Sequence, residues 1–306
     1  MTHVLVVGSV ALDSVETPFG KADEVLGGSA IFFAASASHF APVQVVGVVG
    51  TDYPIEKLAP LEARKVDLAG LERAEGESFR WRGRYRHDLN AAETLETRLG
   101  VFSNFHPKIP KQFRSAPFVF LANIDPRLQL DVLQQVDKPK LVACDTMNFW
   151  IESRRNEFLE LLKYVDVLLL NDSEARQLTE QANLVKAARW IRERGPSFIV
   201  IKKGEHGAYM FGPRSVFFAP AYPLEDVFDP TGAGDSFAGG FIGYLARTGR
   251  TDEEAMRRGV IYGSTMGSFA VERFSIDRLM EIERVDIARR LEEFRRLVAF
   301  EEELPE

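Results

Sequence analysis

The stretch Asp229-Pro-Thr-Gly-Ala-Gly-Asp-Ser-Phe-Ala-Gly-Gly-Phe, residues 229–241, joins a glycine-rich turn to the start of an apolar helix. Such a turn exposes several backbone N–H groups, and the helix dipole adds partial positive charge at the same place. The stretch therefore predicts a binding site for an anion, above all for the charge on a transferring phosphoryl group.

We expect Gly232, Ala233 and Gly234 to supply the N–H groups of this anion hole, together with Asp235. Asp235 falls in the first helical turn, where a carboxylate can take the proton from an attacking hydroxyl. The alternative is a tight turn in which the glycines serve packing alone and Asp235 stabilises the helix. No Gly-Lys-Ser/Thr follows the turn, so it is not a Walker A loop.

Short apolar runs recur on both sides of this stretch and are rich in β-branched residues. They are continuous rather than alternating, which indicates strands with both faces buried in a parallel sheet. Helix-like stretches lie between them, as in doubly wound α/β proteins. We therefore predict one domain over residues 1–306, an α/β fold that forms a Rossmann-like three-layer α/β/α sandwich. The runs are 4–12, 43–50, 118–123, 141–144, 165–171 and 198–204.

One segment, residues 76–106, breaks this rhythm with period-two alternation, which is typical of exposed strands with two unlike faces. We expect a small β-sheet lid made of about residues 14–20 and 76–106, lying over the strand ends where α/β sheets bind ligands. An exposed lid of this kind is also a candidate homodimer surface. The alternating residues are Arg80, Arg82, Arg84 and Arg86 against Trp81, Gly83, Tyr85 and His87.

The two faces of this segment favour different ligands, and the sequence does not decide which face turns inward. The arginines could bind a phosphate or carboxylate of the substrate, because guanidinium suits bidentate anion recognition. Trp81, Tyr85 and His87 would instead suit a nucleobase. A solvated lid face is the plainer interpretation of the arginines.

Composition excludes several classes of protein. The 306 residues carry a formal net charge of −7, which argues against a general affinity for nucleic acid. No apolar run approaches the ~20 residues of a membrane helix. The lone cysteine, Cys144, precludes an intrachain disulfide and favours a reducing compartment, so we expect a cytoplasmic protein.

The stretch 229–241 resembles the C-terminal signature of the ribokinase-like (PfkB) carbohydrate kinase family, D-T-x-G-A-G-D. Further segments resemble family motifs in the same order along nearly the whole chain. They are Gly8–Asp13, Gly27-Gly28, residues 46–52, residues 171–174 and residues 202–208. The resemblance implies transfer of the ATP γ-phosphoryl group to a hydroxyl of a small molecule, with Asp235 as the base and Mg²⁺ as the metal.

The resemblance also implies roles for residues outside the main motif. Asp13 would bind substrate hydroxyls, and Gly27 and Gly28 would help to hold the acceptor. Asn171 and Glu174, in the segment Asn171-Asp-Ser-Glu, match the N-x-x-E motif that organises Mg²⁺, largely through water. The same pair can cap the helix that follows, and both roles can coexist.

The nucleotide site is implied by two segments. Lys202 and Gly204 match the K-x-G-x-x-G segment and would help to hold the phosphates, whereas Lys203 should point to the other face. Thr231 would contact the nucleotide. Family members often bind a monovalent cation near this loop, which implies K⁺ close to Asp229.

Phe32 departs from the family pattern, because many sugar kinases carry an asparagine there that binds the sugar. A phenylalanine facing the site would favour an apolar or aromatic substrate; the alternative is that it packs in the core. The sequence therefore predicts a kinase for a sugar or polyol first, and a nucleoside kinase second. A ligand-binding regulatory protein is the third hypothesis, against which the intact Asp235 and its glycines count.

Overall fold

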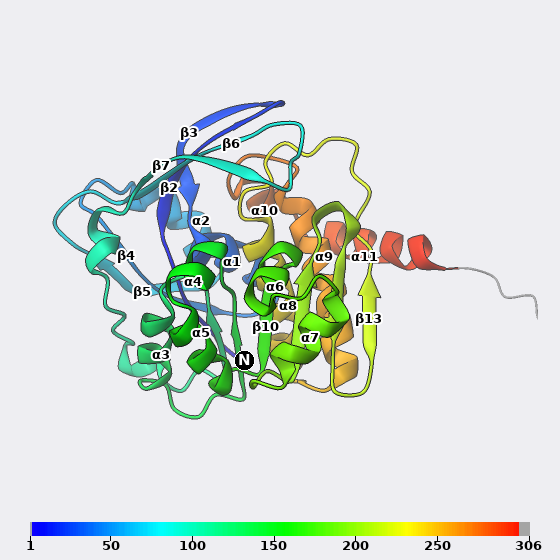
Figure 1. Ribbon diagram of the computed structural model, residues 1–306. Coiled ribbons are helices and arrows are strands. Elements are labelled where there is room, and N and C mark those ends of the chain that lie inside the picture. Colours follow the sequence, from blue (N-terminus) through cyan, green and yellow to red (C-terminus); the bar gives the residue numbers. More distant parts are fainter. Residues whose placement is uncertain (1, 300–306) are drawn as a thin grey trace, which may run out of the picture.

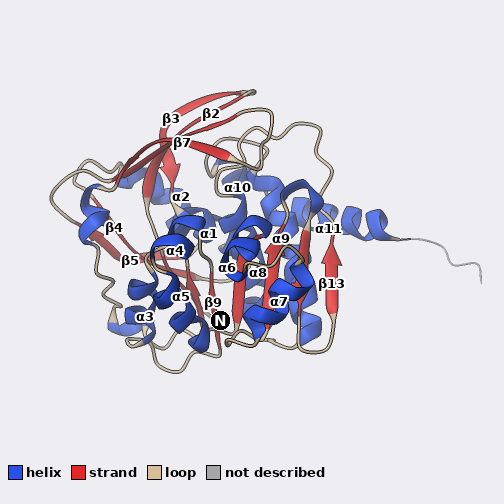
Figure 2. Ribbon diagram, viewed as in Figure 1, coloured by secondary structure: helices blue, strands red, loops and turns tan. Residues whose placement is uncertain are grey.

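The computed structural model describes residues 2–299, and a central sheet of nine strands runs through the middle of the molecule (Figures 1 and 2). The strand order is β13-β12-β11-β10-β9-β8-β1-β4-β5. Neighbouring strands pair in parallel from β5 to β11, whereas β12 and β13 pair antiparallel at one edge. The bounds are β1 (Val4–Val7), β4 (Val43–Val49), β5 (Val66–Arg73), β8 (Phe118–Leu121), β9 (Leu141–Cys144), β10 (Val167–Asn171), β11 (Phe198–Lys202), β12 (Ala208–Phe211) and β13 (Val216–Ala219).

Helices cover both faces of this sheet, and each face has its own apolar core. Successive residues of a strand point to opposite faces, so Val4 and Val6 enter one core and Leu5 and Val7 the other. This arrangement confirms the predicted three-layer α/β/α sandwich. The first core holds α1 (Ser29–Ala37), α2 (Ala59–Ala63), α8 (Ala233–Thr248), α9 (Glu253–Ala270), α10 (Asp277–Glu281) and α11 (Arg284–Val298). The second holds α3 (Pro126–Leu133), α4 (Asn148–Ser153), α5 (Arg155–Leu161), α6 (Asp172–Thr179) and α7 (Leu184–Arg192).

Short 3-10 helices fill several connections between these elements. They are η1 (Ile55–Leu58), η2 (Gly100–Asn104), η3 (Lys111–Phe113), η4 (Leu162–Tyr164) and η5 (Gly204–His206). Within residues 2–299, no helix is both long and apolar enough to cross a membrane.

A second sheet of four strands, in the order β3-β2-β6-β7, stands above one edge of the molecule (Figure 2). Its strands are β2 (Ala11–Thr17), β3 (Gly20–Gly27), β6 (Phe79–Tyr85) and β7 (Ala92–Arg98). The strand expected over residues 4–12 is therefore two strands, because the chain leaves the large sheet after Val7 and enters the small one at Ala11. The small sheet also includes residues 20–27, which the period-two pattern did not reveal.

Candidate active site

The glycine-rich turn enters α8 as the sequence predicts. Gly232 has a left-handed backbone, with φ of 71°, and a β-carbon there would lie 2.2 Å from Cγ of Phe32. Only glycine combines that conformation with that contact. Phe32 is buried beneath the turn, so it supports the turn by packing and does not face a ligand.

The N–H groups of this turn are not all free to bind an anion. Ala233 donates its N–H to the carbonyl of Pro230, at 3.2 Å, which differs from the prediction that it contributes to the hole. The N–H groups of Gly232 and Gly234 have no hydrogen-bond acceptor among residues 2–299. The N–H groups of Gly232 and Gly234, on either side of Ala233, therefore remain for a phosphoryl group at the start of a sixteen-residue helix.

Asp235 lies in the first turn of α8 and is partly exposed. Burial and the nearby charge of Asp145 raise the pKa of Asp235 to about 7, and the charge of Lys202 opposes that rise. A carboxyl group with a pKa near neutrality is well matched to accept a proton at physiological pH.

Lys202 ends β11, next to this turn. Its Nζ lies 2.7 Å from Oδ2 of Asp145, and a β-carbon on Gly234 would lie 3.0 Å from the same Nζ. Burial lowers the pKa of Lys202, but the charges of Asp145 and Glu174 outweigh it and raise the pKa overall. Lys202 therefore remains a cation beside the predicted anion hole.

Asp145 is a site residue that the sequence analysis missed. It directly follows the buried strand β9, as Asn171 and Lys202 stand at the ends of β10 and β11. The carboxyl ends of parallel strands meet at one edge of a sheet, so the same reasoning could have found it.

Asn171 and Glu174 form a reciprocal pair at the start of α6. Oδ1 of Asn171 accepts the N–H of Glu174 at 2.8 Å, and Oε2 of Glu174 accepts the N–H of Asn171 at 2.7 Å. The pair is thus a helix-capping box. Burial and the charge of Asp145 raise the pKa of Glu174 to about 7.

This pair also suits Mg²⁺ held largely through water and phosphate oxygens. Glu174 and Asp235 carry acidic groups whose charges disfavour one another, and a cation would relieve that cost. Within residues 2–299 no group of three or more metal-ligating side chains forms a ready-made cage. Mg²⁺ rarely uses such cages, because it keeps several waters and binds substrate phosphates.

Asp13 lies on β2, where the small sheet leaves the body. Its carboxylate lies against Gly27, where a β-carbon would be 2.0 Å from Oδ2 of Asp13. Gly28 has φ of 92°, and a β-carbon there would be 2.5 Å from the carbonyl oxygen of Ser9. Burial raises the pKa of Asp13 to about 7, and the charges of Asp229 and Asp235 add to the rise. Gly27 thus makes room for a buried carboxylate within electrostatic range of Asp235, and Gly28 lets the chain pass close to the backbone of Ser9.

Tyr53 is a second residue that the sequence did not reveal. It follows β4, is buried, and its hydroxyl has no hydrogen-bond partner among the described residues. Burial raises the pKa of Tyr53, and the charge of Asp13 raises it further, so the two groups are close in space. A buried hydroxyl without a partner can bond a ligand at little cost.

The small sheet turns its aromatic face toward this site. Trp81 lies directly opposite Asp13 in the parallel pairing of β2 with β6, so the two side chains share a face. The ring of Trp81 lies over Gly83, whose β-carbon would be 2.0 Å from it. Tyr85 accepts a hydrogen bond from Oγ1 of Thr231 at 3.3 Å, which joins the sheet to the glycine-rich loop. Thr231, expected at the nucleotide, thus contacts the small sheet.

Arg80, Arg82 and Arg84 lie on the other face of β6, and most arginines of this segment pair with acidic residues. Arg80 contacts Glu24 and Asp52, each at 2.7 Å. Arg84 pairs with Glu16 and Arg86 with Glu93, while Arg82 is exposed. These contacts support the plainer interpretation of the arginine row.

The turn between β6 and β7 reaches across to the segment expected to hold the nucleotide. A β-carbon on Gly204, which has φ of 54°, would lie 1.8 Å from Oδ1 of Asn90. Lys203 instead bonds the hydroxyl of Tyr209 at 3.3 Å and lies over its ring. The Lys202 side chain therefore faces Asp145 and the Lys203 side chain faces Tyr209, as predicted from the alternation of side chains along a strand.

Asp229 is buried at the start of the main motif. Its Oδ1 accepts the N–H of Thr231 at 2.9 Å, and its Oδ2 accepts the N–H of Ser275 at 3.2 Å. The carboxylate fixes the loop before the anion hole.

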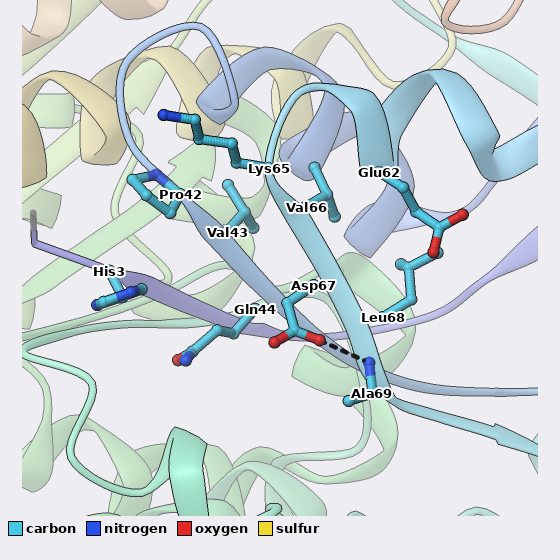
Figure 3. A pocket seen from close by; sticks show the side chains of 10 residues that line it. All are labelled: His3, Pro42, Val43, Gln44, Glu62, Lys65, Val66, Asp67, Leu68 and Ala69. Atoms are coloured by element: carbon cyan, nitrogen blue, oxygen red, sulfur yellow. Dashed lines mark hydrogen bonds between the residues drawn. The ribbon is translucent and has the colours of Figure 1, made fainter.

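A large hollow of about 700 Å³ lies elsewhere, at the start of β4 and β5 (Figure 3). His3, Gln44, Lys65 and Asp67 line it, and Oδ1 of Asp67 accepts the N–H of Ala69 at 2.9 Å. It is at the amino ends of the parallel strands, opposite Asp145 and Lys202, so its size does not mark the predicted site.

Comparison with known proteins places the chain among kinases. The family model "pfkB family carbohydrate kinase" matches residues 1–276. A cytidine kinase of Thermococcus kodakarensis is 32% identical over 267 residues, which is 85% of this chain and 94% of that protein. The Burkholderia thailandensis nucleoside kinase solved with inosine has a TM-score of 0.73 at 18% identity, over 95% of this chain and 98% of that one. An E. coli protein solved with ATP and Mg²⁺ has a TM-score of 0.76 at 17% identity, over 97% and 100%.

Proposed function

Because the chain belongs to the pfkB family of carbohydrate kinases, we propose that it is an ATP-dependent nucleoside kinase. The observation that carries this choice is the face of β6 on which Trp81 shares a side with Asp13. An aromatic ring can stack on a nucleobase, and such stacking is worth about 1–3 kcal/mol. The likeness to a cytidine kinase, over 85% of this chain, supports the same choice.

The acceptor site is built from Asp13, Gly27, Gly28 and Tyr53. Asp13 is a buried carboxylate that can accept hydrogen bonds from sugar hydroxyls, and Tyr53 has a buried hydroxyl without a partner. Buried polar groups of this kind gain when a ligand satisfies them. A ribose bound here would place its base toward Trp81 and its primary hydroxyl toward Asp235.

Asp235 acts as the base in the transfer. The primary hydroxyl attacks the γ-phosphorus of ATP while its proton passes to the Asp235 carboxylate. The new oxygen–phosphorus bond forms as the bond to the bridging oxygen breaks, and ADP leaves with that electron pair. The N–H groups of Gly232 and Gly234 stabilise the charge on the phosphoryl oxygens.

ATP is held by Lys202, Gly204 and Thr231. Lys202 neutralises the charge of the ATP phosphates, Gly204 lets the backbone come close to them, and Thr231 contacts the nucleotide from the glycine-rich loop. Asn171 and Glu174 would hold Mg²⁺ through water, and the bound metal would neutralise the charge of the phosphates. We propose that a monovalent cation, K⁺, would bind near the loop that Asp229 fixes.

A screen of ADP release tests the function directly. The protein is given ATP, Mg²⁺ and K⁺ with nucleosides, free sugars, polyols and sugar phosphates, and Asp235→Asn serves as the blank. We expect turnover with nucleosides. Turnover with sugars alone would establish the sugar kinase, and bound ATP without turnover in any mixture would favour a regulatory protein.

The same proposal includes a homodimer through the small sheet and a cytoplasmic location. All seven residues of the edge strand β7 are exposed, and Leu95 and Leu99 are prominent apolar side chains near it. An open edge of this kind can pair with a second copy. Sedimentation of the wild type and of Leu95→Lys tests the dimer; a monomeric wild type would contradict it.

A further inference from the structure

Lys202 and Asp145 form a buried ion pair beside the proposed phosphoryl site, and Asp145 has no role in the mechanism described so far. The side chains are 17% and 6% exposed, and Nζ of Lys202 lies 2.7 Å from Oδ2 of Asp145. Burying two charges is costly, and such a pair often contributes little net stability. Its location beside Gly234 suggests a role in the site itself.

The backbone and side chain of Asp145 are both fixed. Its N–H donates to the carbonyl of Leu121 at 3.0 Å, and its own carbonyl accepts from Nε2 of the buried Gln129 at 3.2 Å. Oδ1 accepts the N–H of Thr146 at 2.8 Å. The other carboxylate oxygen is thereby aimed at Lys202.

Lys202 needs such an anchor, because a lysine ammonium stands on a flexible four-carbon stem. We propose that Asp145 is a positioning residue that holds the Lys202 ammonium beside the turn at Gly232 and Gly234, where phosphoryl charge develops. This inference rests on the proposed kinase activity and deepens the part assigned to Lys202. In this role Asp145 acts through Lys202 and needs no contact of its own with the nucleotide or the acceptor.

Because Asp145 is negatively charged, its role in positioning Lys202 can be distinguished from a role in binding the nucleotide. A carboxylate near the phosphates does not attract them, so its removal should not weaken Mg·ATP binding. A displaced ammonium should slow the transfer, because a misplacement of about 1 Å can cost about 100-fold. We therefore expect Asp145→Asn to lower kcat about 100-fold without raising the dissociation constant of Mg·ATP. A loss of folding integrity would weaken both.

A double-mutant cycle tests the dependence on Lys202. Asp145→Asn should slow the wild type strongly, but should change the turnover of Lys202→Met by no more than about 2-fold, because Asp145 acts only through the ammonium. Equal losses in both backgrounds would overturn the proposal, as would an unchanged kcat in Asp145→Asn. Glu160→Gln, which removes the partner of Lys163 in an exposed pair, is the matched control and should leave kcat unchanged.

Two further measurements keep the outcome readable. Circular dichroism and thermal unfolding show whether Asp145→Asn folds. If it does not, the turnover of the double variant is compared with that of Lys202→Met alone. Equal rates support the proposal, and a slower double variant contradicts it. If no nucleoside is phosphorylated, the proposed function fails separately. The cycle is then read with the acceptor that is active, or with slow ATP hydrolysis alone, which also requires charge neutralisation by Lys202.

Discussion

The two ends of the central sheet carry polar side chains of similar kinds, but they hold them differently. At the amino ends, Glu62, Lys65 and Asp67 surround a large hollow and are exposed to solvent (Figure 3). At the carboxyl ends, Asp145 and Glu174 are buried near Lys202 and Asp235, and their charges act on one another. Charges kept out of water without full compensation cost stability. The predicted site is therefore distinguished from the hollow by its buried, mutually coupled charges and not by size.

The largest expected effect comes from removing the proposed base. Asp235→Asn should lower turnover by about 10²–10⁴-fold, because the attacking hydroxyl loses its proton acceptor. The release of ADP measures it. Asp67→Asn makes the same chemical change at the opposite end of the sheet and should leave turnover unchanged. If the two substitutions lowered turnover equally, the carboxyl ends of the strands would not be the catalytic end of the sheet.

The stability of the free protein should depend on pH through Asp13. Its pKa rises from the ordinary 3.8 to about 7 on folding, so the folded state binds the proton more tightly. Stability is then lost as pH rises from about 4 to about 7. Asp13→Asn removes this loss and should stabilise the protein by up to about 4 kcal/mol at about pH 8, but not at about pH 4.

Urea unfolding at the two pH values measures this difference. Glu62→Gln, which removes an exposed carboxylate at the amino ends of the strands, is the matched control. A variant of Asp13 that is no more stable at high pH would show that the carboxylate is already compensated in the free protein.

The two faces of the small sheet are expected to contribute differently to nucleoside binding. Trp81→Ala should raise KM for the nucleoside about 10–100-fold, because a stacking surface for the base is lost. The neighbouring Arg82→Ala, on the exposed face, should leave KM nearly unchanged. Steady-state kinetics measure both, and a larger effect from Arg82 would place the wrong face over the substrate.

The smallest effect separates helix capping from metal binding. Glu174→Gln should raise the Mg²⁺ concentration needed for half-maximal activity by about 10-fold. Asn183→Ala removes the N-cap of α7, costs about 1 kcal/mol of stability, and should leave the Mg²⁺ requirement unchanged. A similar Mg²⁺ response in both variants would reduce Glu174 to a capping residue.

The sequence predicted the layers of the fold because continuous apolar runs alternate with helices. The family motifs implied roles for Asp13, Asn171 and Lys202, but no motif covers Asp145, which follows β9. The orientation of Trp81 could not be predicted. It depends on the parallel pairing of β2 with β6, which are more than sixty residues apart in sequence.

Local packing decided two further points that the motifs left open. Phe32 could have faced a ligand, but the left-handed backbone at Gly232 brings the turn directly onto its ring. The N–H of Ala233 is used by the carbonyl of Pro230, a detail of turn geometry that residue types do not encode. Motifs therefore predicted where the site lies, and packing determined which backbone groups are available there.

The most direct test of the central claim is phosphorus NMR of the reaction with ATP, Mg²⁺ and cytidine. The account predicts that a nucleoside 5′-monophosphate resonance grows in step with that of ADP, and that neither grows with Asp235→Asn. ADP with inorganic phosphate as the sole products, or a phosphate ester formed only when a free sugar replaces the nucleoside, would contradict it.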